Sequence, residues 1–233
     1  MEKKAKLLIV EDEVAIRVGL VDVFVYHGFD VDYAEDGPTG LRKATSGRYD
    51  LVLLDVMLPG MDGLAICERI RAEDPEQPII VLTAKTSDEE IVQGLRLGAD
   101  DYVTKPFSVA QLVLRVQAVL RRARTVSGAD PVIRLSGEVE VDTANLSGRC
   151  GARTLSFTRR EAELLQYLSA NTERPVSRDE LLNKVWGYDR HAGIETRTVD
   201  IHVAKLRRKI EPDPTEPVHL VTVRGAGYRL VTG

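Results

Sequence analysis

Cysteine and long hydrophobic runs are both scarce in this sequence. Its 233 residues include two cysteines, Cys67 and Cys150, and neither begins a Cys-x-x-Cys motif. This scarcity favours neither a disulfide framework nor a zinc site, and the four histidines have no ligand spacing either. The longest apolar runs are strand-sized, too short to cross a bilayer, and the first residues contain no signal-peptide core. We therefore expect a cytoplasmic protein with no membrane contact.

Charge is distributed unevenly along the chain. The whole sequence carries a net charge of −4, but residues 1–122 carry −6 and residues 123–233 carry +2. The content of 43% hydrophobic and 29% charged residues is typical of a globular protein, and the length allows two domains. An acidic half followed by a basic half suggests two different roles, with the second half the candidate for binding nucleic acid.

Residues 1–122 have the pattern of a doubly wound α/β domain, in which helices alternate with the strands of a parallel sheet. The run Leu-Val-Leu-Leu at 51–54 is apolar without alternation, which is typical of a strand buried on both faces. We predict strands at 6–10, 31–33, 51–55, 79–83 and 102–103, and helices at 15–28, 38–46, 63–72, 88–97 and 109–122.

Polar side chains stand where four of these strands end. Glu11 and Asp12 follow the first strand, Asp55 ends the third, Thr83 ends the fourth and Lys105 follows the fifth. In a sheet of order 2-1-3-4-5, these ends converge around the switch point between strands one and three. Clustered carboxylates need a cation, and an all-oxygen site suits Mg²⁺. The group predicts a cradle for a phosphoryl group at or beside Asp55; the alternative is a set of independent caps and a surface lysine.

Four segments resemble the receiver domain of two-component response regulators. They are Val-Glu-Asp-Glu at 10–13, Leu-Asp-Val-Met-Leu-Pro-Gly at 54–60, Leu-Thr-Ala at 82–84 and Gly-Ala-Asp-Asp-Tyr-Val-Thr-Lys-Pro-Phe at 98–107. The resemblance implies that Asp55 accepts a phosphoryl group from the phosphohistidine of a sensor kinase.

The same resemblance assigns roles to the residues around the acceptor. Glu11 and Asp12 would organise Mg²⁺ together with the acceptor carboxylate and the main-chain carbonyl of Met57. Thr83 and Lys105 would hold the phosphoryl oxygens.

A conformational switch is also implied. Phosphorylation adds charge and acceptor oxygens beside Thr83 and Lys105, and pulling Thr83 inward vacates space that the ring of Tyr102 can fill. The alternative for Tyr102 is a half-exposed aromatic side chain on an edge strand. The Lys105–Pro106 peptide bond is usually cis in this family.

The OmpR/PhoB branch of the family often dimerises through the face formed by the fourth helix, fifth strand and fifth helix. That face combines an apolar patch with charge pairs. Ile91 and Gln111 stand where the members of a third pair are normally found. The resemblance implies a patch of Val92, Leu95 and Leu114, and charge pairs of Asp100 with Arg122 and Asp101 with Arg115.

Residues 132–233 are predicted to form a smaller α+β domain after a linker at 123–131, which lacks apolar periodicity. Thr158 with Glu161 and Ser177 with Glu180 fit the capping-box pattern that begins a helix. We predict strands at 132–135, 139–142, 146–150 and 153–155 with turns at Gly137 and Gly148, a third helix at 196–210, and a hairpin of 218–223 with 228–231.

The helix at 196–210 has one apolar stripe and one polar face. Val199, Val203, Leu206 and Ile210 are spaced as core residues of a helix. A second set points elsewhere: Arg197, Ile201, Ala204, Lys205 and Arg208. A charged face is often only a solvated face. Here, however, it lies in a helix–turn–helix layout before a glycine-tipped hairpin, which favours a helix in the major groove.

This half resembles the winged-helix DNA-binding domain of OmpR/PhoB regulators through residues 155–165, 178–187, 197–209 and 223–228. The resemblance implies that Arg197, Lys205 and Arg207 contact DNA from the helix and Arg224 from the wing. Ile201 or Ala204 could pack against a thymine methyl group. In activators, the turn at 187–194 would address RNA polymerase.

The sequence therefore predicts a phosphorylation-activated transcriptional regulator that dimerises and binds double-stranded DNA. We expect it to catalyse only its own aspartyl phosphorylation and dephosphorylation, and no other reaction. An aspartyl-nucleophile phosphatase is the enzymatic alternative, but such enzymes generally need a second acid where Met57 stands. The third alternative is a winged helix that binds protein. DNA binding that is absent, or that does not weaken as salt rises, would favour this alternative.

Overall fold

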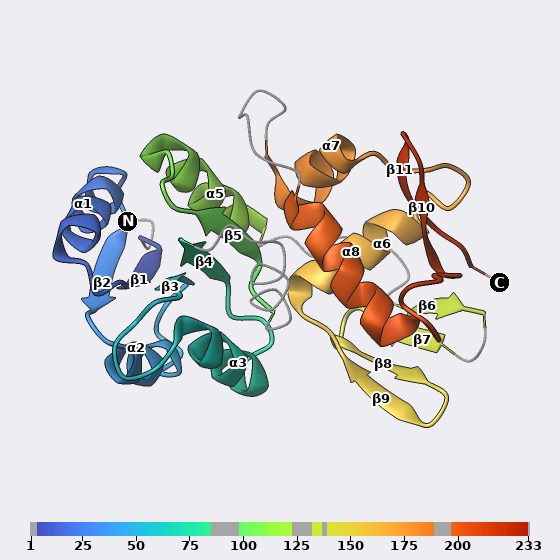
Figure 1. Ribbon diagram of the computed structural model, residues 1–233, viewed down its shortest axis with the longest axis horizontal. Coiled ribbons are helices and arrows are strands. Elements are labelled where there is room, and N and C mark those ends of the chain that lie inside the picture. Colours follow the sequence, from blue (N-terminus) through green and yellow to red (C-terminus); the bar gives the residue numbers. More distant parts are fainter. Residues whose placement is uncertain (1–3, 85–97, 123–131, 137–138, 189–196, 233) are drawn as a thin grey trace. The chain divides into compact units, whose positions relative to one another are not determined.

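The computed structural model describes residues 4–84, 98–122, 132–136, 139–188 and 197–232 (Figure 1). The chain divides into two compact units, Met1–Arg124 and Thr125–Gly233. The linker predicted at 123–131 and the helix predicted at 88–97 lie outside the described residues. Among the helices that are described, none is long and apolar enough to cross a membrane.

The first unit contains the predicted five-stranded parallel sheet. Its order is β2-β1-β3-β4-β5, as expected for a doubly wound domain. Every residue of β3 and of β4 is buried, which confirms that these apolar runs are central strands. The strands are β1 (Lys6–Val10), β2 (Asp30–Ala34), β3 (Leu51–Asp55), β4 (Ile79–Thr83) and β5 (Asp101–Thr104).

Successive residues of the central strands pack into two separate cores. In β1, Leu8 and Val10 belong to one hydrophobic cluster, while Leu7 and Ile9 belong to the other. This alternation arises because neighbouring side chains in a strand point to opposite faces of the sheet. The described helices of this unit are α1 (Val14–Tyr26), α2 (Gly37–Ala44), α3 (Gly63–Glu73) and α5 (Val109–Arg122).

The second unit combines a four-stranded antiparallel sheet, helices and a C-terminal hairpin. The sheet comprises β6 (Val132–Leu135), β7 (Val139–Asp142), β8 (Ser147–Cys150) and β9 (Arg153–Ser156). The helices are α6 (Arg159–Ser169), α7 (Arg178–Leu181), the π-helical turn η1 (Leu182–Trp186) and α8 (Arg197–Ile210). The hairpin pairs β10 (Leu220–Val223) with β11 (Gly227–Leu230).

The apolar spacing and the capping patterns in the sequence predicted helices of this unit that the structure contains. The four stripe residues of α8 are at most 1% exposed, and Thr158 with Glu161 forms a complete capping box. The box predicted at Ser177 is only half formed. Ser177 accepts a hydrogen bond from the Glu180 amide, but the Glu180 carboxylate binds Tyr167 and Arg174 instead.

The turn predicted at Gly148 is wrong. Gly148 lies inside β8, between Val141 of β7 and Leu155 of β9. A Cβ atom there would come within 2.5 Å of the Glu140 carbonyl oxygen, so this glycine permits close strand packing. The chain instead turns at Gly151, which has a φ of 56°.

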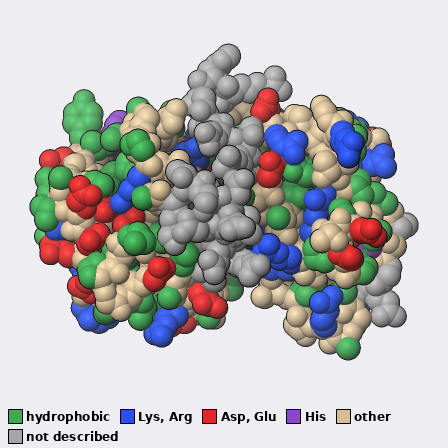
Figure 2. Space-filling model, in the orientation of Figure 1, with side chains coloured by type: hydrophobic (Ala, Val, Ile, Leu, Met, Phe, Trp, Pro, Cys, Tyr) green, Lys and Arg blue, Asp and Glu red, His purple; other side chains and the backbone are tan. Residues whose placement is uncertain are grey.

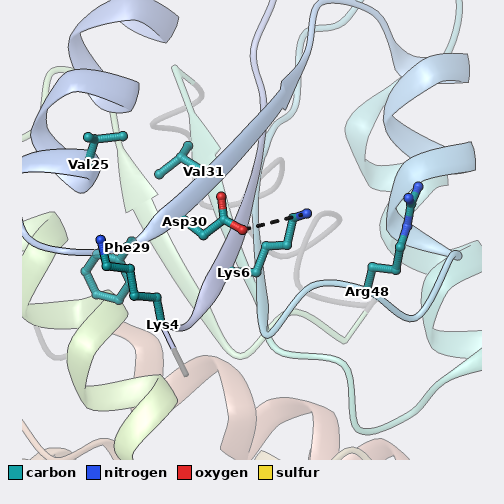
Figure 3. Close-up of a pocket in the computed structure, with 7 residues that line it drawn as sticks. All are labelled: Lys4, Lys6, Val25, Phe29, Asp30, Val31 and Arg48. Atoms are coloured by element: carbon teal, nitrogen blue, oxygen red, sulfur yellow. Dashed lines mark ion pairs between the residues drawn. The ribbon is translucent and has the colours of Figure 1, made fainter. Parts of the chain in front are cut away.

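A pocket of about 520 Å³ opens at the amino ends of the strands in the first unit (Figure 3). Three basic side chains and three apolar ones line it, and Lys6 pairs with Asp30 across 3.8 Å. Lys6 and Asp30 begin β1 and β2, whereas Asp55 ends β3. The pocket is therefore at the opposite edge of the sheet from the predicted phosphoryl site. Its lining residues are Lys4, Lys6, Val25, Phe29, Asp30, Val31 and Arg48.

Gly63 at the start of α3 tests how tightly the sheet edge is packed. A Cβ atom at Gly63 would lie 1.9 Å from the main-chain oxygen of Asp55, so Gly63→Ala must displace backbone. We expect a loss of about 2 kcal/mol in unfolding free energy, measured by urea denaturation followed by circular dichroism. Gly19→Ala is the matched control, because nothing lies within 4 Å of that helical position. It should stabilise the chain by about 0.5–1 kcal/mol; equal effects of the two substitutions would contradict the packing argument.

Candidate active site and nucleic-acid interface

The carboxyl ends of β1, β3 and β5 bring three predicted site residues into direct contact. The Lys105 Nζ lies 2.8 Å from Glu11 Oε2 and 2.9 Å from Asp55 Oδ1. Glu11 is 0% and Asp55 3% exposed. Thr83 ends β4 at the same edge and is also buried, and its carbonyl accepts from the Lys105 amide at 2.7 Å. The Lys105–Pro106 peptide bond is cis, as the family resemblance implied.

Burial and pairing oppose each other in this group. Burial raises the pKa of both the Glu11 and the Asp55 carboxyl groups, although hydrogen bonds from Lys105 partly offset this. Burial acts to lower the pKa of the Lys105 ammonium, but hydrogen bonds to Glu11 and Asp55 outweigh it and leave that pKa raised. Lys105 is therefore held as a cation between two acids.

The acidic side chains also fit a divalent cation. Carboxylate oxygens of Glu11, Asp12 and Asp55 lie within 4.8 Å of one another. One ammonium group cannot neutralise three carboxylates, and oxygen-only ligands suit a hard cation such as Mg²⁺. Glu11 and Asp55 are buried whereas Asp12 is exposed, so the cluster opens to solvent on the Asp12 side. The Met57 side chain is 59% exposed, and its thioether is too soft a ligand for Mg²⁺, so the predicted role falls to its main-chain carbonyl.

The residues predicted for the switch and the dimer face make contacts within the chain. Tyr102 packs against the cluster that contains Val81, and burial raises the pKa of its phenol well above the ordinary value. Asp101 and Arg115 form a buried ion pair of 2.6 Å. Leu114 on α5 is 49% exposed, as a docking residue would need. Val92, Leu95 and the Arg122 side chain lie outside the described residues.

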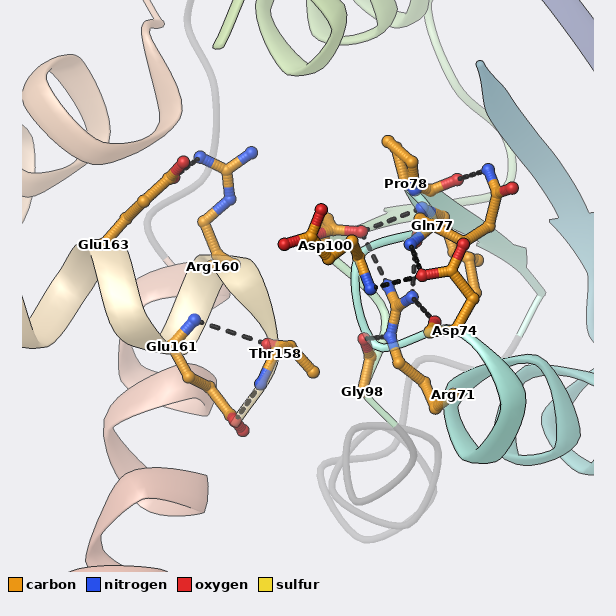
Figure 4. Close-up of polar contacts among 12 residues, drawn as sticks. Arg71, Asp74, Gln77, Pro78, Gly98, Asp100, Thr158, Arg160, Glu161 and Glu163 are labelled. Carbon is orange, nitrogen blue, oxygen red and sulfur yellow. Dashed lines mark hydrogen bonds and ion pairs between the residues drawn. The ribbon is translucent and has the colours of Figure 1, made fainter. Parts of the chain in front are cut away.

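Asp100 is engaged by Arg71 from α3 (Figure 4). The Asp100 Oδ2 accepts hydrogen bonds from Arg71 Nη2 and the Ile79 amide, both at 2.8 Å. Arg71 also donates to the carbonyl oxygens of Gly98, Asp74 and Gln77. Asp100 is 6% exposed, so a pair with Arg122 across a dimer would have to exchange or extend these bonds.

The predicted DNA-contact residues differ in their exposure. Arg208 on α8 and Arg224 at the hairpin tip are exposed, and Ile201 and Ala204 are partly exposed. Lys205, also predicted to contact DNA, is 5% exposed. The Arg197 side chain lies outside the described residues.

Arg207, also predicted to contact DNA, makes hydrogen bonds to the hairpin. Arg207 donates to the Leu220 carbonyl at 2.8 Å and to the Thr222 hydroxyl at 2.7 Å, so it braces the hairpin against α8. Figure 2 shows acidic side chains over much of the first unit and several Lys and Arg side chains over the second.

Comparisons with known proteins agree for both units. Residues 7–117 match the response regulator receiver domain, and residues 152–230 match the C-terminal domain of transcriptional regulatory proteins. The sensory transduction protein RegX3 of Mycolicibacterium smegmatis is 43% identical over 226 residues, covering 96% of this chain and 98% of that protein. This chain belongs to the OmpR/PhoB family of two-component response regulators.

Further relatives support the same assignment. The alkaline phosphatase synthesis transcriptional regulatory protein PhoP of Bacillus subtilis is 39% identical, covering 97% of this chain and 96% of that protein. Among solved structures, a RitR mutant has a TM-score of 0.74 at 27% identity, with 98% of this chain and 100% of that one covered. The OmpR/PhoB homologue DrrB of Thermotoga maritima has a TM-score of 0.52 at 29% identity, with 99% and 100% covered. The chain is thus a response regulator whose C-terminal domain regulates transcription.

The sequence analysis names neither Arg17 nor Arg229 of this response regulator as a candidate site residue. Arg17 in α1 is 6% exposed and binds the loop that carries Glu11 and Asp12. A signal existed, since Arg17 is spaced as a core residue with Leu20, and a buried arginine on a helix is uncommon. Arg229 in β11 is exposed, because it alternates with buried neighbours in the strand.

A hydrogen-bonded triad fixes the wing to α8. The Tyr228 hydroxyl donates to Asp200 Oδ1 at 2.6 Å, and Arg178 Nε donates to the same oxygen at 2.6 Å. Arg178 Nη2 also donates to the Tyr228 oxygen at 3.0 Å. Burial and the bond to Asp200 raise the pKa of Tyr228 to about 12. Since Tyr228 follows the hairpin tip, the triad sets the position of Arg224 relative to α8.

Removing this hydroxyl should weaken the C-terminal domain. We expect Tyr228→Phe to lose about 1 kcal/mol of unfolding free energy at neutral pH, because Asp200 is partly exposed and its bond correspondingly screened. The single tryptophan, Trp186, lies in this domain and reports its unfolding by fluorescence. Tyr26→Phe, at an 87% exposed position, should have no effect.

The same pair of proteins gives a pH test. The folded-state pKa of Tyr228, about 12, lies above the ordinary value of 10.0, so the neutral phenol stabilises the folded domain below about pH 10. The advantage of wild type over Tyr228→Phe should therefore shrink as pH rises from about 10 to about 12. A difference that stays constant over this range would contradict the role of the Tyr228–Asp200 bond.

Proposed function

We propose that Asp55 accepts a phosphoryl group from a sensor histidine kinase, and that this modification promotes dimerisation and DNA binding. One observation carries the proposal: Lys105 Nζ lies 2.9 Å from Asp55 Oδ1 and 2.8 Å from Glu11 Oε2, at the edge where the strand ends converge. Family membership supports a kinase as phosphodonor and DNA as partner.

The chemistry assigned to this site is phosphoryl transfer to a carboxylate. An Asp55 oxygen forms a bond to phosphorus as the phosphorus–nitrogen bond to the kinase histidine breaks, and the imidazole leaves with that electron pair. Lys105 and Thr83 hold phosphoryl oxygens at the same edge. Mg²⁺ bound by Glu11, Asp12, Asp55 and the Met57 carbonyl would neutralise charge on the transferring group. The chain then catalyses only its own phosphorylation and dephosphorylation.

Phosphorylation would redistribute the partners of Lys105. The ammonium group bridges Glu11 and Asp55, and phosphoryl oxygens on Asp55 would offer it stronger acceptors. Thr83 moves toward the new oxygens in this proposal, and Tyr102 follows into the space that Thr83 leaves. The change would bias the face that includes β5 and α5 toward dimerisation.

On DNA, α8 would occupy the major groove and the wing would reach the adjacent groove. The exposed Arg208 and Arg224 support this arrangement through phosphate or base contacts, and Ile201 or Ala204 would pack on thymine methyl groups. Two linked domains gain avidity when a dimer binds paired half-sites. The turn at residues 187–194 would contact RNA polymerase, and most of this turn lies outside the described residues.

The central test is DNA selection from a random-sequence pool, with and without acetyl phosphate and Mg²⁺, by wild type and Asp55→Ala. We expect phosphodonor to enrich a direct or inverted repeat with wild type only. Equal enrichment in all arms would show that Asp55 does not control the output. Absent or salt-insensitive DNA binding would overturn the DNA-binding role, since phosphate contacts make affinity fall with salt.

The dimer face has its own test by analytical ultracentrifugation. Acetyl phosphate with Mg²⁺ should shift wild type toward dimer, and Leu114→Gln should weaken the phosphorylated dimer by about tenfold through lost apolar burial. Val18→Gln is the matched control, because Val18 is 51% exposed and belongs to α1, which is not one of the elements of the proposed face. An equilibrium that phosphorylation leaves unchanged would refute dimerisation as the output.

A further inference from the structure

Arg17 reaches back from α1 to the loop that carries two of the three clustered carboxylates. Its Nη1 donates hydrogen bonds to the carbonyl oxygens of Glu11 at 2.8 Å and Asp12 at 2.9 Å. Its Nη2 pairs with Glu35 at 3.1 Å, and the guanidinium carbon lies 5.4 Å from the centre of the Tyr33 ring. Arg17 is 6% exposed, so the guanidinium is held on several sides and cannot swing away.

The two carbonyls that bind Arg17 belong to the peptide units on either side of Asp12. Each peptide unit is planar, so a donor that binds both carbonyl oxygens restrains φ and ψ of Asp12. Those two angles in turn set the direction of its Cα–Cβ bond. Asp12 is the exposed member of the carboxylate cluster, whereas Glu11 and Asp55 are buried. Packing therefore holds the other two acids, and the main chain must hold Asp12.

We propose that Arg17 is a positioning residue for the divalent cation, acting through the main chain of Asp12. It fixes the loop so that the Asp12 carboxylate faces those of Glu11 and Asp55. Arg17 touches neither the cation nor the phosphoryl group in this scheme. The inference deepens the proposed function and rests on its metal site.

Electrostatics and positioning predict opposite effects of removing Arg17. A guanidinium close to the cluster repels a divalent cation, so its removal would tighten Mg²⁺ binding if charge alone mattered. Loss of positioning would instead weaken binding, because Asp12 would no longer be held in place. The direction of the change in Kd therefore distinguishes the two roles.

The test is a Mg²⁺ titration of the full chain, followed through backbone amide shifts by NMR. We expect Arg17→Gln to raise the Kd by about tenfold, as loss of an outer partner of a metal ligand typically does. Arg42→Gln removes the same charge from an exposed position and should change the Kd less than about twofold. An unchanged or lower Kd for Arg17→Gln would overturn the proposal.

Arg17→Lys provides a second variant should Arg17→Gln fail to fold. One ammonium group has three donors and can bind both carbonyls, so the Kd should stay within about threefold of wild type. A tenfold loss in Arg17→Lys would also count against the proposal.

Asp12→Asn separates this inference from the function on which it rests. If wild type binds no Mg²⁺, or Asp12→Asn does not weaken binding, the proposed metal site itself fails. If both behave as proposed, the double variant with Arg17→Gln decides the route. Less than additive effects support action through Asp12, and fully additive effects overturn it.

Discussion

The receiver domain depends on one partly buried ammonium group between two buried acids. Glu11 and Asp55 would repel each other at this distance without Lys105, whose Nζ lies within 3 Å of an oxygen of each. The arrangement needs β1 and β3 to be neighbours and β5 to lie one strand beyond β4, which the sheet order provides. Because the Lys105 ammonium group is shared between two carboxylates, new charge on either one would change how it is shared. This makes the site suitable as a switch.

Buried or partly buried arginines bind main-chain carbonyl oxygens in both domains. Arg17 binds the carbonyls of Glu11 and Asp12, and Arg71 binds those of Gly98 and Gln77 in the loops before β5 and β4. In the C-terminal domain, Arg160 binds the Val185 carbonyl and Arg207 the Leu220 carbonyl. A guanidinium carries five donors in a fixed fork, so one side chain can satisfy several carbonyls that loops leave without a strand or helix partner.

Helix α8 serves two purposes at once. Its apolar stripe belongs to the domain core, while Asp200 binds Tyr228 of the wing and Arg178 of α7. These contacts fix the wing and helix relative to each other before any DNA is present. Less side-chain and loop ordering then remains to oppose binding, which is the physical advantage of a preorganised surface.

The sequence by itself determined the features that short-range patterns encode. Unbroken apolar runs gave the buried strands, four-three-four spacing gave the α8 stripe, and motif positions gave the polar edge around Asp55. Tertiary structure alone decided the binding of Arg71 to Asp100, the burial of Lys205, the packing role of Gly148 and the reach of Arg17 to the acidic loop. Period and propensity report which face of an element is apolar. They carry no information on which side chains or main-chain groups of other elements approach that face.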